Sequence, residues 1–348
     1  MTENGGKSGK PRVLTVGVDL GTSRSAVSAS NGERHVIDSF VGWPVDMVAR
    51  KVLKKKVLIG EEAVENRIML DLRRPLEKGL IREGSERDAE AVQELLSHLL
   101  SLVKTDEDGD NLKVRAVVGV PAEALRVNKQ QLRNAMEGLV DSLMIVSEPF
   151  AVAYGLEALL HALVVDIGAG TSDFCVMNGR YPTDDDQRTL TMAGDYIDDQ
   201  LHELITSKHS EATFSRHMIR EWKEQHSFVG ESKDPIVVSA PVQGKPTDFD
   251  ITEEMKIACE SLLPPVTETM IDLVARVEPE YQAKVRSNVI LSGGSCLIRG
   301  MGQVMQEALK DVGGGQVRVV KDPIFVGSDG GLALAKDAPA SDWEKLNS

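Results

Sequence analysis

The sequence contains few cysteines, few aromatic residues and a deficit of positive charge. Its 348 residues include three cysteines, Cys175, Cys259 and Cys296, whose odd number and wide spacing fit neither a disulfide framework nor a metal site. Aromatic residues make up 4% of the chain, so stacking platforms for bases or sugars are not expected and the core should be aliphatic. The 40 Lys and Arg residues against 54 Asp and Glu residues give a net charge of −14, which repels nucleic-acid phosphates. We therefore expect a reducing, cytoplasmic environment and no nucleic-acid partner.

Long apolar runs are also missing from the sequence. No run approaches the roughly 20 apolar residues that cross a bilayer, so we expect no direct membrane insertion. Residues 1–11 are rich in Gly, Lys, Ser and Asn instead of carrying the pattern of a signal peptide, and we predict a disordered arm there. At roughly 150 residues per domain, the length predicts about two domains.

Apolar, β-branched runs alternate with segments of helical period along the chain, which predicts α/β layers. The segment Val16–Ser23 is echoed by Val164–Asp173, and the aspartates Asp19 and Asp166 of the two copies lie 147 residues apart. A repeat at nearly half the chain length indicates two related α/β halves facing each other across a cleft. The elements predicted around the repeats are strands at 12–19, 24–29, 34–38, 114–120, 143–146, 162–166, 172–177, 188–192 and 287–291, a hairpin at 236–251 that turns at 244–246, and helices at 86–104, 123–139, 195–207, 253–262 and 266–277.

Each copy of the repeat places an aspartate at the carboxyl end of a buried strand, followed by glycine and then by small hydroxyl residues. Glycine lets the backbone approach a ligand and turn successive N–H groups inward, and such concave turns bind phosphate. One turn of this kind is commonly only a strand connection, whereas two facing copies predict a phosphate clamp. Bare carboxylates repel phosphates, so Asp19 and Asp166 predict a Mg²⁺ ion held partly through water. Neither copy has the spacing of a P-loop or of the Rossmann fingerprint.

Two further segments have both a structural and a functional interpretation. Glu148 follows a strand and begins a helix of small residues, so it either stabilises the first helical turn or orients the water that attacks a γ-phosphate. The turn Gly293-Gly294-Ser295 follows an apolar strand and is either a common strand-to-helix connection or a flat surface for adenosine. The sequence around each segment leaves both interpretations open.

Taken in order, these features resemble the five motifs of the actin, sugar kinase and DnaK-type chaperone superfamily. The set consists of the two phosphate segments, a connecting Ser147-Glu148-Pro149 helix, the Gly293-Gly294 turn and a terminal helix at Gly327–Ala335. Within the superfamily the chain is most similar to bacterial actins, in particular to the magnetosome-associated filament proteins of magnetotactic bacteria. The stretches that carry this closer similarity are Leu70–Leu76, Lys223–Gly230 and Pro279–Ala283.

The resemblance implies an actin-like α/β fold, with two related halves that each have a core subdomain and a smaller inserted subdomain. ATP or ADP with Mg²⁺ would lie in the cleft between the halves. The implied division gives subdomain IA at residues 12–38, 80–160 and 325–348, subdomain IB at 39–79, subdomain IIA at 161–195 and 251–324, and subdomain IIB at 196–250.

The resemblance also implies a role for each site residue. Glu148 would position water, and Asp166 would organise Mg²⁺ together with Asp19. Where bacterial relatives often carry a ribose-binding Glu three positions before a lysine near the adenosine, this chain has Arg220 before Lys223. The nucleotide-binding residues implied in this way are Asp19, Gly21, Thr22, Ser23, Gly168, Ala169, Gly170, Thr171, Lys223, Gly293, Gly294, Ser295 and Ile298.

The implied function is that of an ATP-dependent cytoskeletal filament protein. It would polymerise head to tail with other copies of itself in the presence of ATP and Mg²⁺, and ATP hydrolysis would control filament turnover. Magnetosome-associated proteins would be further partners in the cytoplasm. The alternative is a small-molecule, sugar-type kinase of the same superfamily, for which we identify neither a catalytic base nor an acceptor pocket.

Three charged segments are predicted to be surface features. The basic run at residues 50–56 predicts an exposed charged hairpin, with a filament contact as the alternative. The alternating acids at 106–110 lack the glycine and the final Glu of a calcium loop and predict a solvated loop. The run Asp184–Asp186 predicts a surface turn.

Overall fold

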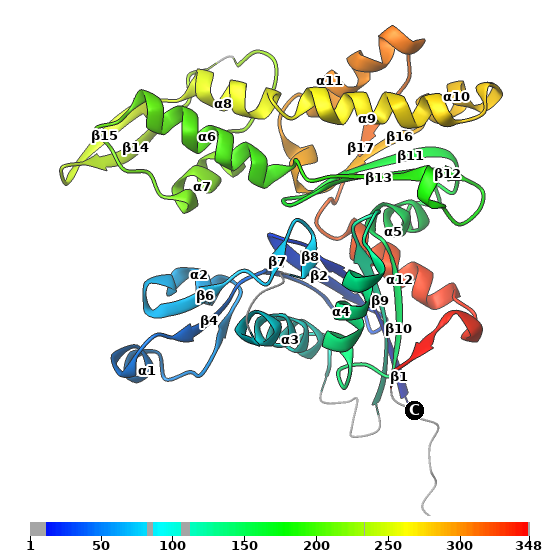
Figure 1. The fold of residues 1–348 in the computed structure, drawn as a ribbon, viewed down its shortest axis with the longest axis horizontal. Coiled ribbons are helices and arrows are strands. Elements are labelled where there is room, and N and C mark those ends of the chain that lie inside the picture. Colours follow the sequence, from blue (N-terminus) through cyan, green and yellow to red (C-terminus); the bar gives the residue numbers. More distant parts are fainter. Residues whose placement is uncertain (1–11, 82–85, 106–111, 233, 347–348) are drawn as a thin grey trace, which may run out of the picture.

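Two mixed β-sheets, one from each half of the chain, form the frame of the computed structural model, which describes residues 12–81, 86–105, 112–232 and 234–346 (Figure 1). The first sheet has the order β18 (Glu344–Lys345), β10 (Ser142–Ser147), β9 (Leu112–Val120), β1 (Arg12–Leu20), β2 (Arg24–Ala29) and β3 (Arg34–Asp38). The second has the order β13 (Gln187–Leu190), β12 (Ser172–Asn178), β11 (Leu160–Ile167), β16 (Val289–Ser292) and β17 (Val317–Val319).

The two copies of the repeated segment have the same strand arrangement. In the first sheet β1 is antiparallel to β2, which follows its turn, and parallel to β9 from later in the chain. In the second sheet β11 is antiparallel to β12 and parallel to β16. The turns that follow β1 and β11 therefore lie at equivalent positions in the two halves.

Two helices, α5 (Glu148–Gly155) and α12 (Val326–Asp337), lie at the junction of the two halves (Figure 1). They approach closely because each has a glycine at the crossing: a Cβ on Gly330 of α12 would lie 1.9 Å from the carbonyl oxygen of Ala151, and a Cβ on Gly155 of α5 would lie 2.7 Å from the Cα of Gly330. A Cβ on Gly17 of β1 would lie 2.0 Å from the carbonyl oxygen of Ser328. The absence of side chains at Gly330 and Gly17 therefore lets α12 pack directly on α5 and β1.

The first half has a main core and a small separate one. Helices α3 (Glu86–Ser101) and α4 (Arg126–Met136) pack on the first sheet and complete the main core. The small core consists of Leu58, Ala63 and Leu70, next to a three-stranded sheet. The elements of this small unit are β4 (Val41–Pro44), α1 (Met47–Leu53), β5 (Leu58–Ile59), α2 (Glu61–Glu65), the 3₁₀ helix η1 (Arg67–Met69), β6 (Leu70–Arg73) and the hairpin strands β7 (Leu76–Glu77) and β8 (Leu80–Ile81).

The basic run at residues 50–56 does not form the predicted hairpin. Asp46 accepts a hydrogen bond from the N–H of Ala49 and caps α1, so Arg50 and Lys51 lie in a helix. Positive charge is favourable there because both residues are in the last turn, where the helix dipole is negative. Lys54 ends the helix with a φ of 55°.

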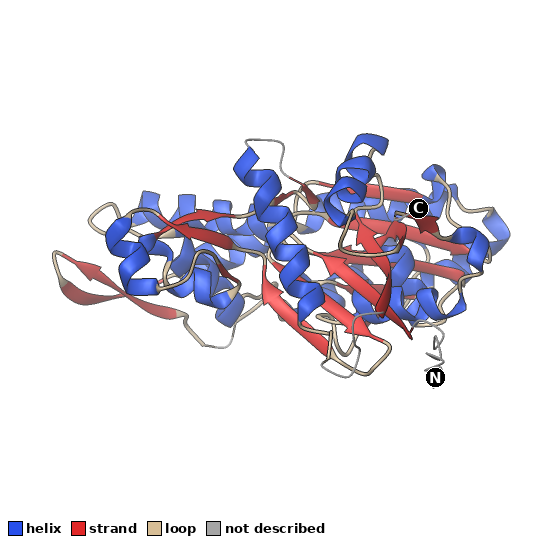
Figure 2. Cartoon of the chain, turned by 90° about the horizontal axis from the view of Figure 1, so that it is seen from below, coloured by secondary structure: helices blue, strands red, loops and turns tan. Residues whose placement is uncertain are grey.

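The second half has one continuous core, which extends from the second sheet into the helices around it. Figure 2 shows the hairpin of β14 and β15 projecting from one end of the molecule. The elements outside the sheet are α6 (Gly194–Lys208), α7 (Arg216–His226), β14 (Val237–Val242), β15 (Lys245–Asp250), α8 (Thr252–Glu260), α9 (Leu263–Arg276), α10 (Pro279–Arg286), α11 (Met301–Ala308) and the 3₁₀ helices η3 (Asp184–Asp186), η4 (Gly294–Leu297) and η5 (Leu309–Val312), with η6 (Ala340–Asp342) near the end of the chain.

Most predicted elements are present with shifted ends. The strands at 24–29 and 34–38 match β2 and β3, whereas the helix predicted at 123–139 is shorter at both ends. The β14–β15 hairpin turns at Gln243 and Gly244, not over 244–246, because these two residues take the positive φ values of 50° and 80° that suit a two-residue turn. The predicted arm at 1–11 and the acidic loop at 106–110 lie outside the described residues.

Two other sequence predictions concern cysteines and membranes. The three cysteines are buried and unbridged. In the part of the chain that the structure describes, no helix is both long and apolar enough to cross a membrane.

Candidate functional site

Every residue that the sequence predicted for the site lines one cavity of about 300 Å³ between the two halves. A volume of this size lies in the range of small-molecule pockets. We name the turn Asp19–Arg24 the first loop and the turn Asp166–Asp173 the second loop. The lining residues that the sequence did not predict are Arg24, Ala26, Val36, Gly79, Gly194, Arg220, Glu224, Ser227, Leu297, Pro323 and Ile324.

Three acidic side chains, Asp19, Asp166 and Glu148, line this cavity, and none of them forms an ion pair with a residue that the structure describes. Burial, and then the charge of Asp166, raise the pKa of Asp19 to about 7. Burial also raises the pKa of Asp166 to about 6, although the hydroxyl of Ser292 donates to its Oδ2 at 2.6 Å and opposes the shift. A bound cation would relieve the electrostatic repulsion among these acidic side chains.

Glu148, the third acid, begins α5 directly after β10. Burial and the charges of Asp19, Asp173 and Asp166 raise its pKa well above the ordinary value. Its buried Oε1 has no hydrogen-bond partner among the described residues. A buried carboxyl oxygen without a partner is costly, so this atom is suited to a ligand or water molecule that the cavity would hold.

The glycine turn of the second loop is held by contacts within its own half, while the carboxylate of Asp173 at the end of the loop accepts from the N–H of Ala122 in the first half at 2.8 Å. The hydroxyl of Ser295 donates to the carbonyl oxygen of Gly168 at 3.0 Å, and the N–H of Asp195 donates to that of Ala169 at 2.7 Å. Within the loop, the N–H of Gly168 donates to the carbonyl oxygen of Thr171 at 2.9 Å. These bonds fix the loop against the start of α6 and against Ser295 of η4.

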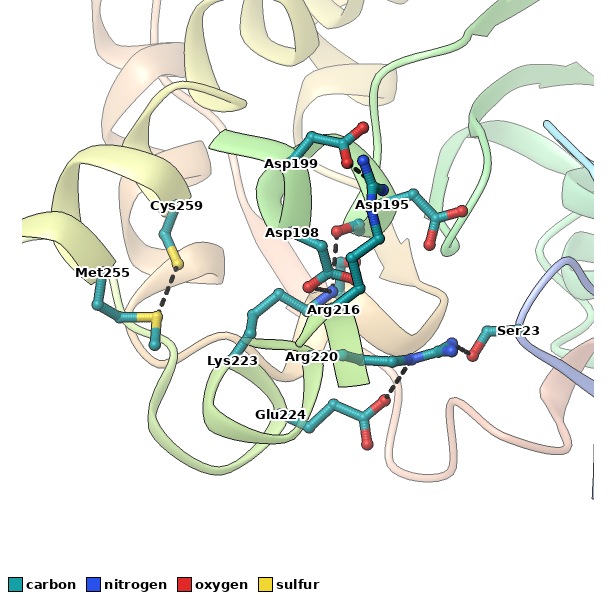
Figure 3. A network of polar contacts seen from close by, with 12 residues as sticks. Ser23, Asp195, Asp198, Asp199, Arg216, Arg220, Lys223, Glu224, Met255 and Cys259 are labelled. Atoms are coloured by element: carbon teal, nitrogen blue, oxygen red, sulfur yellow. Dashed lines mark hydrogen bonds and ion pairs between the residues drawn. The ribbon is translucent and has the colours of Figure 1, made fainter. Parts of the chain in front are cut away.

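The first loop has contacts with more distant segments. Arg74, which follows β6, donates from Nε to the carbonyl oxygen of Thr22 at 2.8 Å. The N–H of Gly79 in the β7–β8 hairpin donates to the Thr22 hydroxyl at 2.8 Å. Arg220 of α7 donates to the hydroxyl of Ser23 from across the cavity (Figure 3).

The two loops meet at Gly170. A Cβ at this position would lie 2.4 Å from Oγ1 of Thr22 and 2.9 Å from both the N of Gly79 and the Cα of Lys78. A side chain cannot be added there without moving one of the loops or the hairpin. Gly170 therefore permits the close approach that two phosphate-binding turns need.

The Gly293-Gly294-Ser295 turn forms another wall of the cavity. Gly293 has a φ of 79°, and a Cβ there would lie 2.4 Å from the carbonyl oxygen of Ile167. A Cβ on Gly294 would have no neighbour within 4 Å, so this part of the backbone is open. Such a turn presents a flat backbone surface next to the apolar side chains of Leu297, Ile298 and Ile324.

Helix α7 contributes the predicted Lys223 and two polar side chains that were not predicted as ligand contacts, Arg220 and Glu224. Lys223 donates to the carbonyl oxygen of Gly194 at 2.8 Å and pairs with Asp198 at 2.7 Å. Arg220 and Glu224 line the same cavity, and Figure 3 shows them side by side on the helix. Residues three and four apart lie on one helix face, so the prediction for Lys223 already pointed to Arg220 and Ser227 as neighbours.

Within the described ranges, no group of three His, Cys, Asp or Glu side chains has the arrangement of a protein-only metal centre. Mg²⁺ commonly binds one or two carboxylates together with phosphates and water. Asp19 and Asp166 fit such a role because they face the cavity and each other's charge.

Comparisons with known proteins give a coherent result. The model of the MreB/Mbl protein family matches residues 13–340. Actin-like protein MamK of Paramagnetospirillum magneticum is 41% identical over 333 residues, which are 96% of this chain and 95% of that protein. The chain thus matches nearly the whole length of this relative.

Solved structures of MamK are also similar to this chain. The structure of a MamK double helical filament matches with a TM-score of 0.91 at 41% identity, and the match covers 94% of this chain and 100% of the MamK chain. A non-polymerising MamK mutant bound to AMPPNP has a TM-score of 0.71 at 40% identity, with the same two coverages. These matches confirm the predicted actin-like fold and the predicted resemblance to bacterial actins.

Proposed function

The chain belongs to the MreB/Mbl family of actin-like proteins, and from this premise we propose that it is an ATP-dependent cytoskeletal filament protein. It polymerises head to tail with ATP and Mg²⁺, and it hydrolyses ATP to control filament turnover. The observation that carries the proposal is the meeting of the two repeated loops on one cavity, in a chain that is similar over 94% of its length to a MamK filament. The similar MamK mutant with bound AMPPNP supports a nucleotide as the ligand.

The phosphates of the nucleotide bind between the two loops. Backbone N–H groups and the hydroxyls of Thr22, Ser23 and Thr171 are donors for phosphate oxygens. Mg²⁺ is held near Asp19 and Asp166 and supplies the positive charge that these acids lack. With the cation bound, the pKa values of the acids fall and their charged forms persist at neutral pH.

Glu148 positions the water that attacks the γ-phosphate. Its unpaired Oε1 accepts a hydrogen bond from that water, which aligns a lone pair with the phosphorus atom. Asp166, with its orientation fixed by Ser292, organises the cation and its water shell. Hydrolysis then yields ADP and phosphate, and the loss of the γ-phosphate removes a ligand that both loops share.

The adenosine binds on the other side of the cavity. Its base lies against the open backbone at Gly294 and the side chain of Ile298, and Lys223 lies on the facing helix. The carboxylate of Glu224, which pairs with Arg24 at 2.8 Å, lines this side of the cavity and would accept from ribose hydroxyls through its other oxygen, in place of the acid that relatives carry at the position of Arg220.

The subdomain boundaries predicted from the sequence belong to the same proposal. The small separate core near Leu58 supports a unit at residues 39–79, while the continuous core of the second half leaves the boundary between IIA and IIB less marked. We also propose a cytoplasmic filament that positions magnetosome organelles, with magnetosome-associated proteins as partners, because the 41% identity to MamK extends over 96% of the chain.

Negative-stain electron microscopy of the purified protein with ATP and Mg²⁺, with ADP and without nucleotide tests the function directly. We expect filaments with ATP above a critical concentration, and fewer or none without nucleotide. ATP consumption that a small substrate stimulates, without assembly under any nucleotide or salt condition, would instead identify the kinase alternative.

A further inference from the structure

Three consecutive residues of the first loop, Thr22, Ser23 and Arg24, are linked to the opposite half of the molecule. Ser23 and Arg24 contact that half directly, and Thr22 is linked to it through Arg74. The carbonyl oxygen of Thr22 accepts from Arg74, and Arg74 also pairs with Asp195 of α6. The hydroxyl of Ser23 accepts from Arg220 of α7. Arg24 donates to Glu224 of α7 at 2.8 Å. The first loop therefore connects the two halves and also lines the cavity.

Among these links, the ion pair of Arg74 with Asp195 has better geometry than the ion pair of Arg24 with Glu224. The two terminal nitrogens of Arg74 reach the two carboxylate oxygens of Asp195 at 2.9 and 3.0 Å, while Nε binds the Thr22 carbonyl oxygen. The side chains of Arg74 and Asp195 are 27% and 33% exposed. A forked guanidinium–carboxylate pair of this kind is among the stronger polar contacts, and partial burial limits its screening by salt.

Asp195 connects this pair to the second loop. Its N–H donates to the carbonyl oxygen of Ala169 at 2.7 Å, so Arg74 and Asp195 form a continuous link from Thr22 in the first loop to Ala169 in the second. Neither Arg74 nor Asp195 is among the described residues that line the cavity. Any effect of this pair on a ligand must therefore pass through the relative position of the two loops.

The pair of Arg24 and Glu224 forms a second, weaker link at the edge of the cavity. Both side chains are more exposed, at 48% and 41%, and exposed ion pairs contribute little to stability. Each also has a competing partner, because Arg24 lies 3.5 Å from Asp38 and Glu224 lies 3.5 Å from Arg220. We therefore expect this link to hold the two halves together less strongly than the link through Arg74.

We propose that the ion pair of Arg74 and Asp195 is a closing strap that retains the bound nucleotide by holding the two loops together, with Arg24 and Glu224 as a weaker second strap. The inference rests on the proposed nucleotide site and adds its regulation. Nucleotide leaves when the halves separate, and separation requires both straps to break. Arg74 and Asp195 are positioning residues, since they act on the ligand through the loops.

The experiment measures the dissociation of a fluorescent ADP analogue, mant-ADP with Mg²⁺, when excess unlabelled ATP is added below the critical concentration for assembly. We expect Arg74→Ala and Asp195→Ala each to accelerate release roughly tenfold, the scale of a charge-assisted hydrogen bond. The double variant should release no faster than the faster single variant, because each residue acts through the other. Arg24→Ala should accelerate release only about twofold to threefold.

Arg216 and Asp199 provide matched controls, since they form an ion pair within the second half near the same helices (Figure 3). Arg216→Ala and Asp199→Ala make the same charge changes and should leave the release rate within about twofold of the wild type. If circular dichroism shows that Arg74→Ala does not fold, Arg74→Lys and Asp195→Asn apply the same test with smaller changes. Thermal unfolding of each variant separates faster release from general destabilisation.

Wild-type release rates in Arg74→Ala and Asp195→Ala, or multiplying effects in the double variant, would overturn the strap while leaving the proposed function intact. A wild-type protein that binds no mant-ADP at all would overturn the proposed function and the strap with it.

Discussion

The first and second loops are copies of one sequence pattern, yet different parts of the molecule hold them in place. The glycine turn of the second loop is bonded to its own half through the backbone of α6 and the hydroxyl of Ser295, and the opposite half reaches this loop at its last residue, where Asp173 accepts from the N–H of Ala122. The first loop is bonded through Arg74, Gly79 and Arg220, which belong to a distant segment of its own half or to the opposite half. Duplication thus preserved the turn and its aspartate but not the contacts around it.

This difference assigns the loops different tasks. A loop fixed within one half offers a constant surface to the phosphates and the cation. A loop fixed across the cavity changes its position when the halves move, so it couples the ligand to the arrangement of the molecule. Variants in and around each loop test this division.

The acids that would act on water and cation should show the largest effect. Glu148→Ala and Asp166→Ala should each reduce ATP hydrolysis by roughly 10²-fold or more, the scale seen when a preorganised catalytic group is removed. Phosphate release measures this rate, and the exposed Asp185→Ala provides a control with the same change of charge. Nucleotide binding should survive Glu148→Ala, whose side chain acts on water. Wild-type turnover in both site variants would contradict the roles given to them.

The contact between the loops is tested by two glycines of the second loop. Gly170→Ala places a Cβ against Thr22 and the backbone at Lys78 and Gly79, and we expect at least about tenfold weaker nucleotide binding because the loops must separate. Gly168→Ala changes the same loop, but its Cβ would lie 3.4 Å from the nearest protein atom, the carbonyl oxygen of Thr171, so it does not force the loops apart and should weaken binding less than Gly170→Ala. Titration of mant-ADP measures both affinities. Equal affinities for the two variants would show that the loops do not need this close approach.

The two aspartates should differ in how they make stability depend on pH. Their folded-state pKa values of about 7 for Asp19 and about 6 for Asp166 lie above the ordinary value of 3.8, so the folded protein keeps protons that the unfolded chain has lost. Without nucleotide or Mg²⁺, the free energy of unfolding should therefore fall as pH rises from about 4 towards 7, by at most about 1.4 kcal/mol per pH unit for each carboxyl.

Between pH 6 and 7 Asp19 should contribute more to the remaining slope than Asp166, whose pKa lies lower. Asp19→Asn should therefore reduce the slope of the stability profile in that window more than Asp166→Asn does, because burial is the larger cause of the shift of Asp19. Urea unfolding in EDTA at a series of pH values measures both profiles. If Asp166→Asn removed the dependence of stability on pH between pH 6 and 7 and Asp19→Asn left it unchanged, Asp166 would be the residue with the higher pKa.

The smallest effect is expected from Ser292, whose hydroxyl distinguishes the environment of Asp166 from that of Asp19. Ser292→Ala removes a hydrogen bond to the charged carboxylate and should raise the pKa of Asp166. The affinity for Mg²⁺ with nucleotide should then fall by a few fold, the scale of one hydrogen bond to a charged group. Unchanged affinity would mean that this hydrogen bond does not prepare Asp166 for the cation.

The sequence was sufficient to predict the turns but not their anchoring. The repeat around Asp19 and Asp166 is a local pattern of apolar strand, acid and glycine, and such patterns locate strand ends well. All residues predicted for the site line the same cavity. Arg74, Arg220 and Glu224 were not predicted to anchor the loops, because their partners are distant in the sequence and only the packing of the two halves brings them together.

The helices and strands within the small unit at residues 41–81 could not be predicted from sequence patterns, although the resemblance implied a subdomain at 39–79. Its strands are two to four residues long, too short to show a periodic signal, and the basic run was predicted as a hairpin where α1 forms. The cap at Asp46 was the local signal that could have identified this helix.

The most direct test of the central claim records light scattering and phosphate release in the same sample after ATP and Mg²⁺ are added. The account predicts that scattering rises above a critical concentration, that phosphate release accompanies it, and that Glu148→Ala assembles while releasing phosphate roughly 10²-fold more slowly. Phosphate release by the wild type with no rise in scattering at any protein concentration would contradict a filament whose turnover ATP controls.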